Sequence, residues 1–491
     1  MVSGRARRTN GAGRVSTAGS AIRAPGHRKF LASAVPFWGG LMVAASVAGL
    51  AAGSTAALAW VGAVLLAVIA LLLMPGLLKI GSAVFRIPGL TKQHLIVLAY
   101  LLLMGAAFLP IFEGYDPLRE GLTGRRTYEL GLMSAALAVV ALHAVVRRHP
   151  QLNFGRFEIQ ALLAFVFVGF ASALWSLNPT LTVAKAGQLL AIIVASVMMG
   201  PLIQRNKLLR VDLPYLVALS ALLLIVSYSI ANRLIWGTFL VYRESWGGVS
   251  RLVLGHAHPL ASGNVAGLGA IGLLASNRGG GTKGLLLLPF LAVLWLTSAR
   301  GPAVGFLAGG LGMALVSLGP RLRRRIVAGV LGICVGLLII FLSGVDLERL
   351  WPTYRSQLRL ETLVGLSGRL DLWSYTLERV MERPILGVGY EAGRYILLEY
   401  APWAGIAHNS FLEVLIGTGV VGFVVILIIC AAVLRTIART RDALLVGLTL
   451  YMLFYGMTNP VLFVPGYGMA LLTIAIVRAV RAQARITTTG W

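Results

Sequence analysis

The residues best suited to chemistry in this sequence stand at the ends of apolar segments. His408 and Asn409 directly precede the apolar run SFLEVLIGTGVVG, which carries three glycines. The start of a helix disfavours an imidazolium, so we expect the His408 ring to be neutral. A neutral imidazole can accept a proton from a hydroxyl group or donate one. His408 is therefore a candidate acid–base residue, and the alternative is an interfacial histidine that only caps the helix.

Several arginines stand in comparable places. Arg251 lies in SRLVLGHAHPLASGN, Arg300 in the turn SARGP and Arg369 in SGRLDLW. An isolated arginine at a helix end usually extends to the membrane interface. Several arginines beside one histidine instead predict a receptor for a phosphate-rich group, because a guanidinium pairs bidentately with phosphate oxygens. Arg125 and Arg126, in another predicted external connection, are further candidates for substrate binding.

His256 and His258 form an H-x-H pair that could hold a metal ion from an extended segment. No further ligand is evident nearby, so we retain His258 as a candidate for substrate binding. The sequence also lacks a D-x-D motif, a Walker loop G-x-x-x-x-G-K-[ST] and a G-x-S-x-G elbow. It therefore predicts neither a metal nor another cofactor, and it predicts no ATP hydrolysis.

The elements that must position these residues are membrane helices. Of the 491 residues, 58% are hydrophobic and only 12% are charged, far from the composition of a soluble domain. Apolar runs long enough to cross a bilayer lie near 36–53, 56–74, 93–112, 128–146, 157–175, 182–203, 212–231, 262–276, 282–298, 301–319, 326–343, 409–434, 442–457 and 461–477. The sequence predicts an all-α polytopic membrane protein with about 12–14 spans.

The distribution of charge predicts which loops face which side. A basic N-terminal tail is expected at the cytoplasmic face, and with that start 28 of the 43 Lys and Arg residues fall on the cytoplasmic side. This asymmetry accounts for the net charge of +26 without a nucleic-acid partner. The same alternation places the two longest loops outside, where function is expected.

The predicted organisation follows from these spans. It comprises a cytoplasmic tail 1–33, N-terminal helices 34–231, a first external loop 232–261, central helices 262–343, a large external loop 344–408, C-terminal helices 409–478 and a cytoplasmic tail 479–491. Within the large loop, GRLDLWSYTLERVMER predicts an amphipathic helix and PILGVGY a turn.

Helical periodicity relates His408 to the glycines that follow it. At 100° per residue, His408, Leu412, Leu415, Gly419 and Gly422 would share one face of the helix 409–434. Glycines on such a face predict the close approach of a neighbouring helix.

The same residues carry a resemblance to a known family. H-N-x-x-L-x-x-L-x-x-x-G-x-x-G, read from His408 to Gly422, resembles the signature of the O-antigen ligase and polymerase superfamily. ALWSLNP at 173–179, S-x-R-G at 298–301, S-G-R with a following Trp at 367–373 and P-x-x-G-x-G at 384–389 occur in the order of that family. One departure is Gly417, where members of the family often carry an acidic residue, and Glu413 lies one turn earlier.

This resemblance implies a metal-independent, inverting glycosyltransferase with a GT-C-like fold. It implies transfer of a glycan from undecaprenyl diphosphate to an acceptor at the periplasmic face of the bacterial inner membrane. Arg251, Arg300 and Arg369 would hold the diphosphate, and His408 would act on the acceptor hydroxyl as a base or an orienting group. Asn409 would fix the turn or contact sugar. A carboxylate acid remains open.

The choice of acceptor also remains open at this stage. A ligase that uses a lipid acceptor of the lipid A–core type is the leading hypothesis for lipopolysaccharide or surface polysaccharide biosynthesis, with membrane lipids as its other partners. A polymerase that extends the same lipid-linked glycan is the alternative. A transporter or flippase is less favoured, because transporters place ionisable residues near the bilayer midplane, whereas these arginines lie at the outer ends of the spans.

Overall fold

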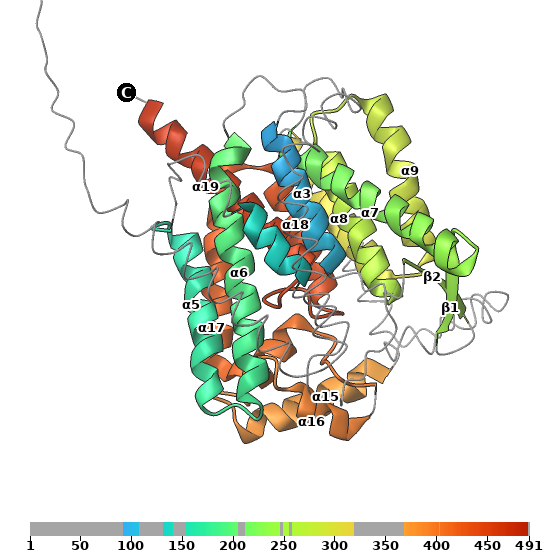
Figure 1. Ribbon diagram of the computed structural model, residues 1–491. Coiled ribbons are helices and arrows are strands. Elements are labelled where there is room, and N and C mark those ends of the chain that lie inside the picture. Colours follow the sequence, from blue (N-terminus) through green and yellow to red (C-terminus); the bar gives the residue numbers. More distant parts are fainter. Residues whose placement is uncertain are drawn as a thin grey trace, which may run out of the picture. The chain divides into compact units, whose positions relative to one another are not determined.

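The protein is an all-α polytopic membrane protein, as its sequence predicts (Figure 1). The computed structural model describes residues 92–107, 131–140, 154–204, 212–245, 249–254, 258–318, 368–401 and 403–489. All of them belong to one compact unit, Ser54–Trp491. The predicted tail 1–33, the predicted spans 36–53, 56–74 and 326–343, and the candidates Arg125, Arg126 and His256 lie outside the described residues.

The described helices follow one another along the chain with short connections. Before the first long loop they are α3 (Lys92–Ala107), a helix at Gly131–Val140, α5 (Phe157–Ala171) with the 3₁₀ turn η1 (Ser172–Leu174), α6 (Pro179–Gln204) and α7 (Leu213–Trp236). After it come α8 (Pro259–Ala275), α9 (Gly280–Leu296), α10 (Arg300–Ser317), α15 (Arg369–Glu382), α16 (Arg394–Tyr400), α17 (Ser410–Thr440), α18 (Ala443–Gly456) and α19 (Tyr467–Thr489).

Four of the described helices are long and apolar enough to cross a bilayer. They are Phe157–Leu174, Pro179–Gly200, Leu213–Leu234 and Ser410–Thr440. The helices at Pro259–Ala275, Gly280–Leu296 and Ala443–Gly456 are apolar but shorter.

A β-hairpin interrupts the predicted all-helical pattern in the first long loop. Strands β1 (Val241–Ser245) and β2 (Val249–Val253) pair antiparallel, with Arg243 opposite Arg251 in the register. Leu252 and Val253 are buried at the end of β2, next to the start of α8. The hairpin escaped prediction because five-residue strands leave too short an alternating pattern between two strongly apolar helices.

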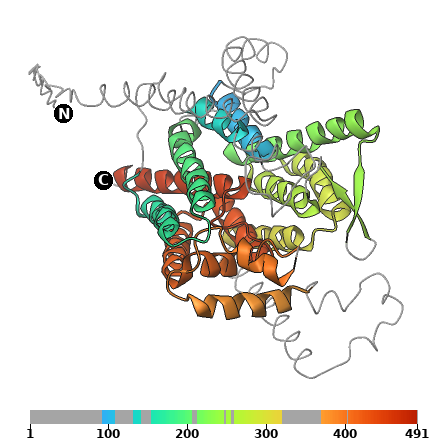
Figure 2. The same cartoon turned by 60° about the horizontal axis from the view of Figure 1, so that its bottom comes forward.

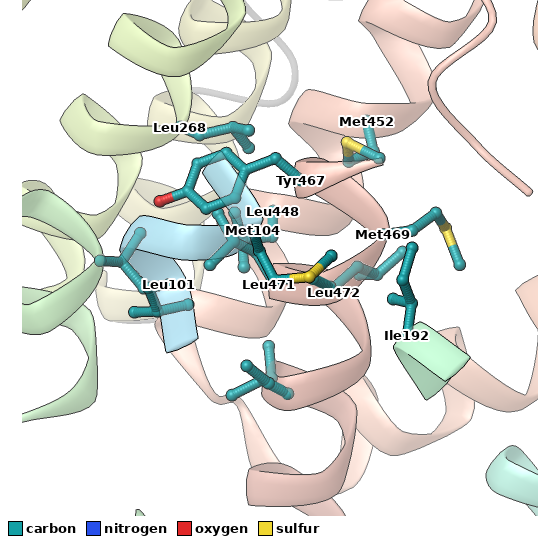
Figure 3. Packing of buried hydrophobic residues seen from close by; sticks show 14 of the residues in the cluster. Leu101, Met104, Ile192, Leu268, Leu448, Met452, Tyr467, Met469, Leu471 and Leu472 are labelled. Atoms are coloured by element: carbon teal, nitrogen blue, oxygen red, sulfur yellow. The ribbon is translucent and has the colours of Figure 1, made fainter. Parts of the chain in front are cut away.

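The helical core is formed by apolar side chains from segments far apart in the sequence. Figure 3 shows Leu101 and Met104 of α3 meeting side chains of α6, α8, α18 and α19. One polar contact crosses this core, where the hydroxyl of Tyr467 lies 2.8 Å from Oγ of Ser220. Close helix packing through glycine occurs between α10 and α18, since a Cβ at Gly309 would lie 2.6 Å from the carbonyl oxygen of Gly447.

The last predicted span, 461–477, has the wrong boundaries. Residues 457–466 are not helical, and α19 begins at Tyr467 and continues through the predicted tail to Thr489. Pro460 and Pro465 account for the late start, because proline lacks the N–H that a helix interior requires. The apolar residues between these prolines drew the sequence interpretation toward a span, and they instead pack into the core, as buried Leu462 and Phe463 show.

The connections predicted to be external meet at one end of the helices. Figure 1 shows α15 and α16 below the ends of α5, α6 and α17, and Figure 2 brings this region, coloured orange, toward the viewer. Nε1 of Trp175, after α5, donates to the carbonyl of Leu386 at 3.0 Å. A Cβ at Gly301, in the first turn of α10, would lie 2.6 Å from Oγ1 of Thr458, after α18.

Candidate active site

The helix that follows His408 is broken. α17 is interrupted at Gly419, whose φ of 62° and ψ of −162° are not helical. Backbone hydrogen bonds from a loop segment replace the missing helical ones: Gly389 N–H donates to Gly417 O at 2.8 Å, and Val420 N–H donates to Pro384 O at 2.8 Å. The predicted common face of His408 and Gly419 is therefore wrong, because periodicity is lost at the break.

The glycines of α17 receive a loop backbone rather than a neighbouring helix. A Cβ at Gly387, where φ is 65°, would lie 2.6 Å from the carbonyl carbon of Gly417. A Cβ at Gly419 would collide with the carbonyl of Ile385. The P-x-x-G-x-G segment 384–389 is thus the partner of the broken helix, and both need glycine because their backbones touch.

The ALWSLNP segment holds the same loop from its other side. Leu177 N–H donates to Val388 O at 3.0 Å, beside the indole contact of Trp175 with Leu386. Nδ2 of Asn178 donates to the hydroxyl of Tyr395 in α16 at 2.6 Å. These motif residues therefore anchor the external loop onto the α5–α6 connection.

The backbone before His408 is held on both of its polar groups. Oε2 of Glu413 accepts from Ala407 N–H at 2.7 Å, and Nε1 of Trp373 donates to Ala407 O at 3.0 Å. His408 itself has a φ of 50°, a left-handed conformation that is uncommon for a residue with a side chain. The two contacts at Ala407 restrain this conformation.

Asn409, and not His408, caps α17. Its Oδ1 accepts from Phe411 N–H at 2.9 Å and from Leu412 N–H at 3.3 Å. The alternative interpretation of His408 as the cap is therefore wrong, and the predicted turn-fixing role of Asn409 is confirmed. Its predicted contact with sugar stays a prediction.

The His408 ring is neutral, as predicted, although mainly for another reason. Burial lowers its pKa from 6.5 to about 4, and the positive charge of Arg369 lowers it further, with a smaller effect from His258. A hydrogen bond with the Asn459 side chain opposes this shift. Among the described residues, the buried Nδ1 atom has no hydrogen-bond partner. Desolvation therefore outweighs the helix terminus that the sequence interpretation invoked.

The three predicted arginines come together around this histidine from three elements. Arg251 lies in β2, while Arg300 and Arg369 are the first residues of α10 and α15. Burial lowers the pKa of Arg251, and the charge of Arg300 adds to this effect. Burial also lowers the pKa of Arg369, to which Tyr455 acts oppositely and Arg251 in the same direction. The arginines are thus close enough to repel one another.

This positive charge has little compensation within the described part of the chain. No carboxylate there forms an ion pair with Arg251, Arg300 or Arg369. Nη1 of Arg369 donates to the backbone carbonyl of Thr458 at 2.8 Å, whereas the buried Nε of Arg251 has no partner among the described residues. Clustered guanidinium groups without carboxylates form a receptor for an anion with several oxygens.

Asn459 is a site residue that the sequence interpretation missed. Besides its contact with His408, its Nδ2 donates to the hydroxyl of Tyr455 at 3.2 Å, and its carbonyl accepts from Oγ of Ser410 at 3.1 Å. The polar turn T-N-P between two apolar segments, on the side predicted for His408, was the available signal. It was overlooked because the turn was interpreted as a simple connection.

His258 caps α8 through its side chain. Its Nδ1 accepts from Leu260 N–H at 3.2 Å, and its ring is near enough to His408 to affect that pKa. Within the described residues, no group of three or more His, Cys, Asp and Glu side chains could hold a metal ion. His258 therefore has a helix-capping role beside the site, and its contact with substrate stays a prediction.

Comparison with known proteins identifies the class of this domain. Residues 285–427 match the O-antigen ligase family, and they include Arg300, Arg369 and His408. The family resemblance inferred from the sequence is confirmed for this segment. The match covers less than a third of the chain, and the structure adds Arg251, from before it, and Asn459, from after it.

A curated relative points the same way. The chain is 26% identical over 186 residues to a protein of Rickettsia conorii that is provisionally named a polysaccharide ligase. The alignment covers 35% of this chain and 44% of the relative, so the chain spans less than half the length of that protein. Together these comparisons support a ligase-like membrane enzyme of the glycosyltransferase type in polysaccharide biosynthesis.

Proposed function

We propose that this protein transfers a glycan from undecaprenyl diphosphate to a lipid acceptor of the lipid A–core type. The transfer takes place at the periplasmic face of the bacterial inner membrane. The observation that carries the proposal is the convergence of Arg251, Arg300 and Arg369 beside the neutral His408, within a domain of the O-antigen ligase family. The positive charge suits a diphosphate, and the neutral imidazole suits a hydroxyl group.

The arginines act on the leaving group. The acceptor oxygen forms a bond to the anomeric carbon of the donor sugar from the face opposite the diphosphate, and the bond from that carbon to the diphosphate oxygen breaks. Negative charge develops on the departing diphosphate, and positioned guanidinium groups stabilise it. Because the arginines provide this stabilisation, the proposed reaction inverts the anomeric carbon and needs no metal ion.

His408 acts on the acceptor. Its unpaired Nδ1 can accept a hydrogen bond or a proton from the acceptor hydroxyl. A histidine with a pKa of about 4 is a weak base, so orientation of the hydroxyl contributes more than full deprotonation in the absence of donor. The negative charge of the bound diphosphate raises the basicity of the ring and partly restores its use as a base.

Reconstitution with purified substrates tests the proposal. The protein in proteoliposomes receives an undecaprenyl-diphosphate glycan and either lipid A–core or a second lipid-linked repeat unit, with and without EDTA. We expect transfer to lipid A–core, unchanged by EDTA. Transfer only to the second repeat unit would establish the polymerase alternative. Loss of transfer with EDTA, restored by magnesium or manganese, would contradict the arginine-based mechanism.

Cysteine labelling tests the side of the membrane. Single cysteines replace Phe239, near the site, and Arg435, near the opposite end of α17, in a chain whose two native cysteines are replaced by alanine. A membrane-impermeant maleimide added to intact spheroplasts should label position 239 and not position 435. The reverse pattern would place the site on the cytoplasmic face.

A further inference from the structure

A row of aromatic rings leads from the surface of the external loop to His408. The rings of Tyr375 and Tyr400 have centroids 5.1 Å apart, and those of Tyr400 and Trp403 are 6.3 Å apart. The ring of Trp403 then lies 6.2 Å from the His408 imidazole, tilted by 37°. The row joins α15, the end of α16 and the segment before α17, so separate elements contribute to it.

Two of these rings are open to a ligand. Tyr400 is 38% exposed and Trp403 is 39% exposed, which is high for large aromatic side chains in an ordered loop. Tyr375 is covered, since the guanidinium of Arg379 lies 4.9 Å above its ring and its hydroxyl donates to Ile396 O. The open part of the row therefore ends at Arg379 on one side and at His408 on the other.

We propose that Tyr400 and Trp403 form a stacking platform for the sugar residues of the acceptor glycan. The inference rests on the proposed function and extends it to a substrate subsite. Sugar rings present apolar C–H faces that pack on aromatic rings, while their hydroxyl groups remain available to polar side chains at the rim. Exposed Glu399 and the Arg379–Glu382 pair provide such polar groups along the row.

The neighbours of His408 favour the acceptor over the donor as occupant. Arg369 affects the ring from the arginine cluster, where the donor diphosphate binds in the proposed reaction. Trp403 is its aromatic neighbour. A hydroxyl group that contacts Nδ1 of His408 belongs to a sugar that can then continue over Trp403 and Tyr400. The spacing of these two rings suits consecutive sugars of one chain.

Separate Michaelis constants for donor and acceptor test the platform. In the reconstituted reaction with lipid A–core, Trp403→Ala should raise the acceptor KM about tenfold, equivalent to about 1.4 kcal/mol, and leave the donor KM within twofold. Trp403→Phe should retain most of the affinity, because it keeps an aromatic face. Phe239→Ala, which removes an aromatic side chain 55% exposed near β1, is the matched control and should change neither constant.

A binding measurement separates the platform from the proposed reaction. Core oligosaccharide, freed of lipid by mild acid hydrolysis, is titrated into the detergent-solubilised protein by calorimetry. Wild type should bind it and Trp403→Ala should not, even if no donor is present. If the second repeat unit is the true acceptor, the same titration uses the repeat-unit oligosaccharide.

The outcomes that overturn the platform are distinct. Transfer by wild type with an unchanged acceptor KM in Trp403→Ala and Tyr400→Ala would remove the platform and leave the proposed function intact. A rise in the donor KM alone would assign the rings to the donor. Binding of neither oligosaccharide by wild type would also overturn it, and loss of thermal stability without rescue by Trp403→Phe would assign the rings to packing or membrane anchoring.

Discussion

Glu413 accepts a hydrogen bond from the backbone N–H of Ala407, the residue immediately before His408. The carboxylate is 6% exposed and lies in the first turn of α17, so it connects the helix to the segment that carries the imidazole. A buried polar contact of this kind holds one backbone arrangement, and loss of the acceptor leaves a buried N–H without a partner. The position of His408 therefore depends on a residue one helical turn away.

Substitution of Glu413 tests this dependence. Glu413→Gln keeps a carbonyl oxygen that can accept from Ala407 N–H, so we expect more than a third of the wild-type turnover. Glu413→Leu removes the acceptor, and turnover should fall about tenfold to a hundredfold because a misplaced catalytic group loses its geometry. Both variants are measured at saturating donor and acceptor. Equal activity of the Gln and Leu variants would show that the hydrogen bond does not position His408.

Gly419 should tolerate no side chain. In Gly419→Ala the new Cβ meets the carbonyl of Ile385, and the residue must keep a φ of 62°. We expect destabilisation of about 1–3 kcal/mol, seen as a lower melting temperature in detergent. Gly310→Ala is the control, since its nearest neighbour would be a side-chain atom of Leu274 at 3.8 Å. Equal melting temperatures of the two variants would contradict the docking of 384–389 into the broken helix.

The pH dependence of turnover should report the charge state of His408. Because the folded protein holds the pKa of this ring at about 4, the free enzyme keeps its neutral imidazole until the pH falls toward that value. The bound diphosphate raises this pKa, so the acid limb of kcat should lie at higher pH than that of kcat/KM. Coincident acid limbs would show that the donor does not act on His408 electrostatically.

Folding stability should show the matching dependence. The ring titrates near 6.5 in the unfolded chain and near 4 in the folded one, so the unfolded state binds more protons between these values. The contribution of His408 to stability is therefore unaffected above pH 6.5 and becomes less favourable as the pH falls from 6.5 toward 4. Comparison of melting temperatures with His408→Gln across this range isolates the term, and parallel curves would contradict it.

Arg300 should act on the donor and on turnover together. It is exposed at the first residue of α10 and contributes charge near Arg251. Arg300→Ala should raise the donor KM and lower kcat, because the diphosphate is charged both before and during transfer. Arg300→Lys should recover part of the binding and less of kcat, since lysine keeps the charge but loses the bidentate geometry. An effect on the acceptor KM alone would reassign this residue.

The sequence predicted most helices and the residues that meet at the site, for physical reasons that can be named. Long apolar runs predict spans because they have few alternative structures in a bilayer. Arg300 and Arg369 were recognised because charged residues at the outer ends of such spans stand out. The alternation of the spans then predicted that the two arginines and His408 would lie at one end of the helices.

The details that sequence did not predict arise from contacts between distant segments. Gly419 breaks α17 only because the backbone of 384–389 supplies replacement hydrogen bonds, and helical periodicity contains no information about that partner. Asn459 reaches His408 from a turn whose two prolines look like an ordinary end of a helix. Five-residue strands β1 and β2 depend on pairing with each other more than on their own pattern.

The most direct measurement is the transfer rate of His408→Ala, compared with wild type at matched thermal stability. The ring is partly exposed and Asn409 provides the helix cap, so its removal should leave the protein folded and inserted. If the imidazole acts on the acceptor hydroxyl, the rate should fall about a hundredfold or more while the donor KM changes little. Near-normal turnover of His408→Ala would contradict the account and would leave catalysis to the arginines alone.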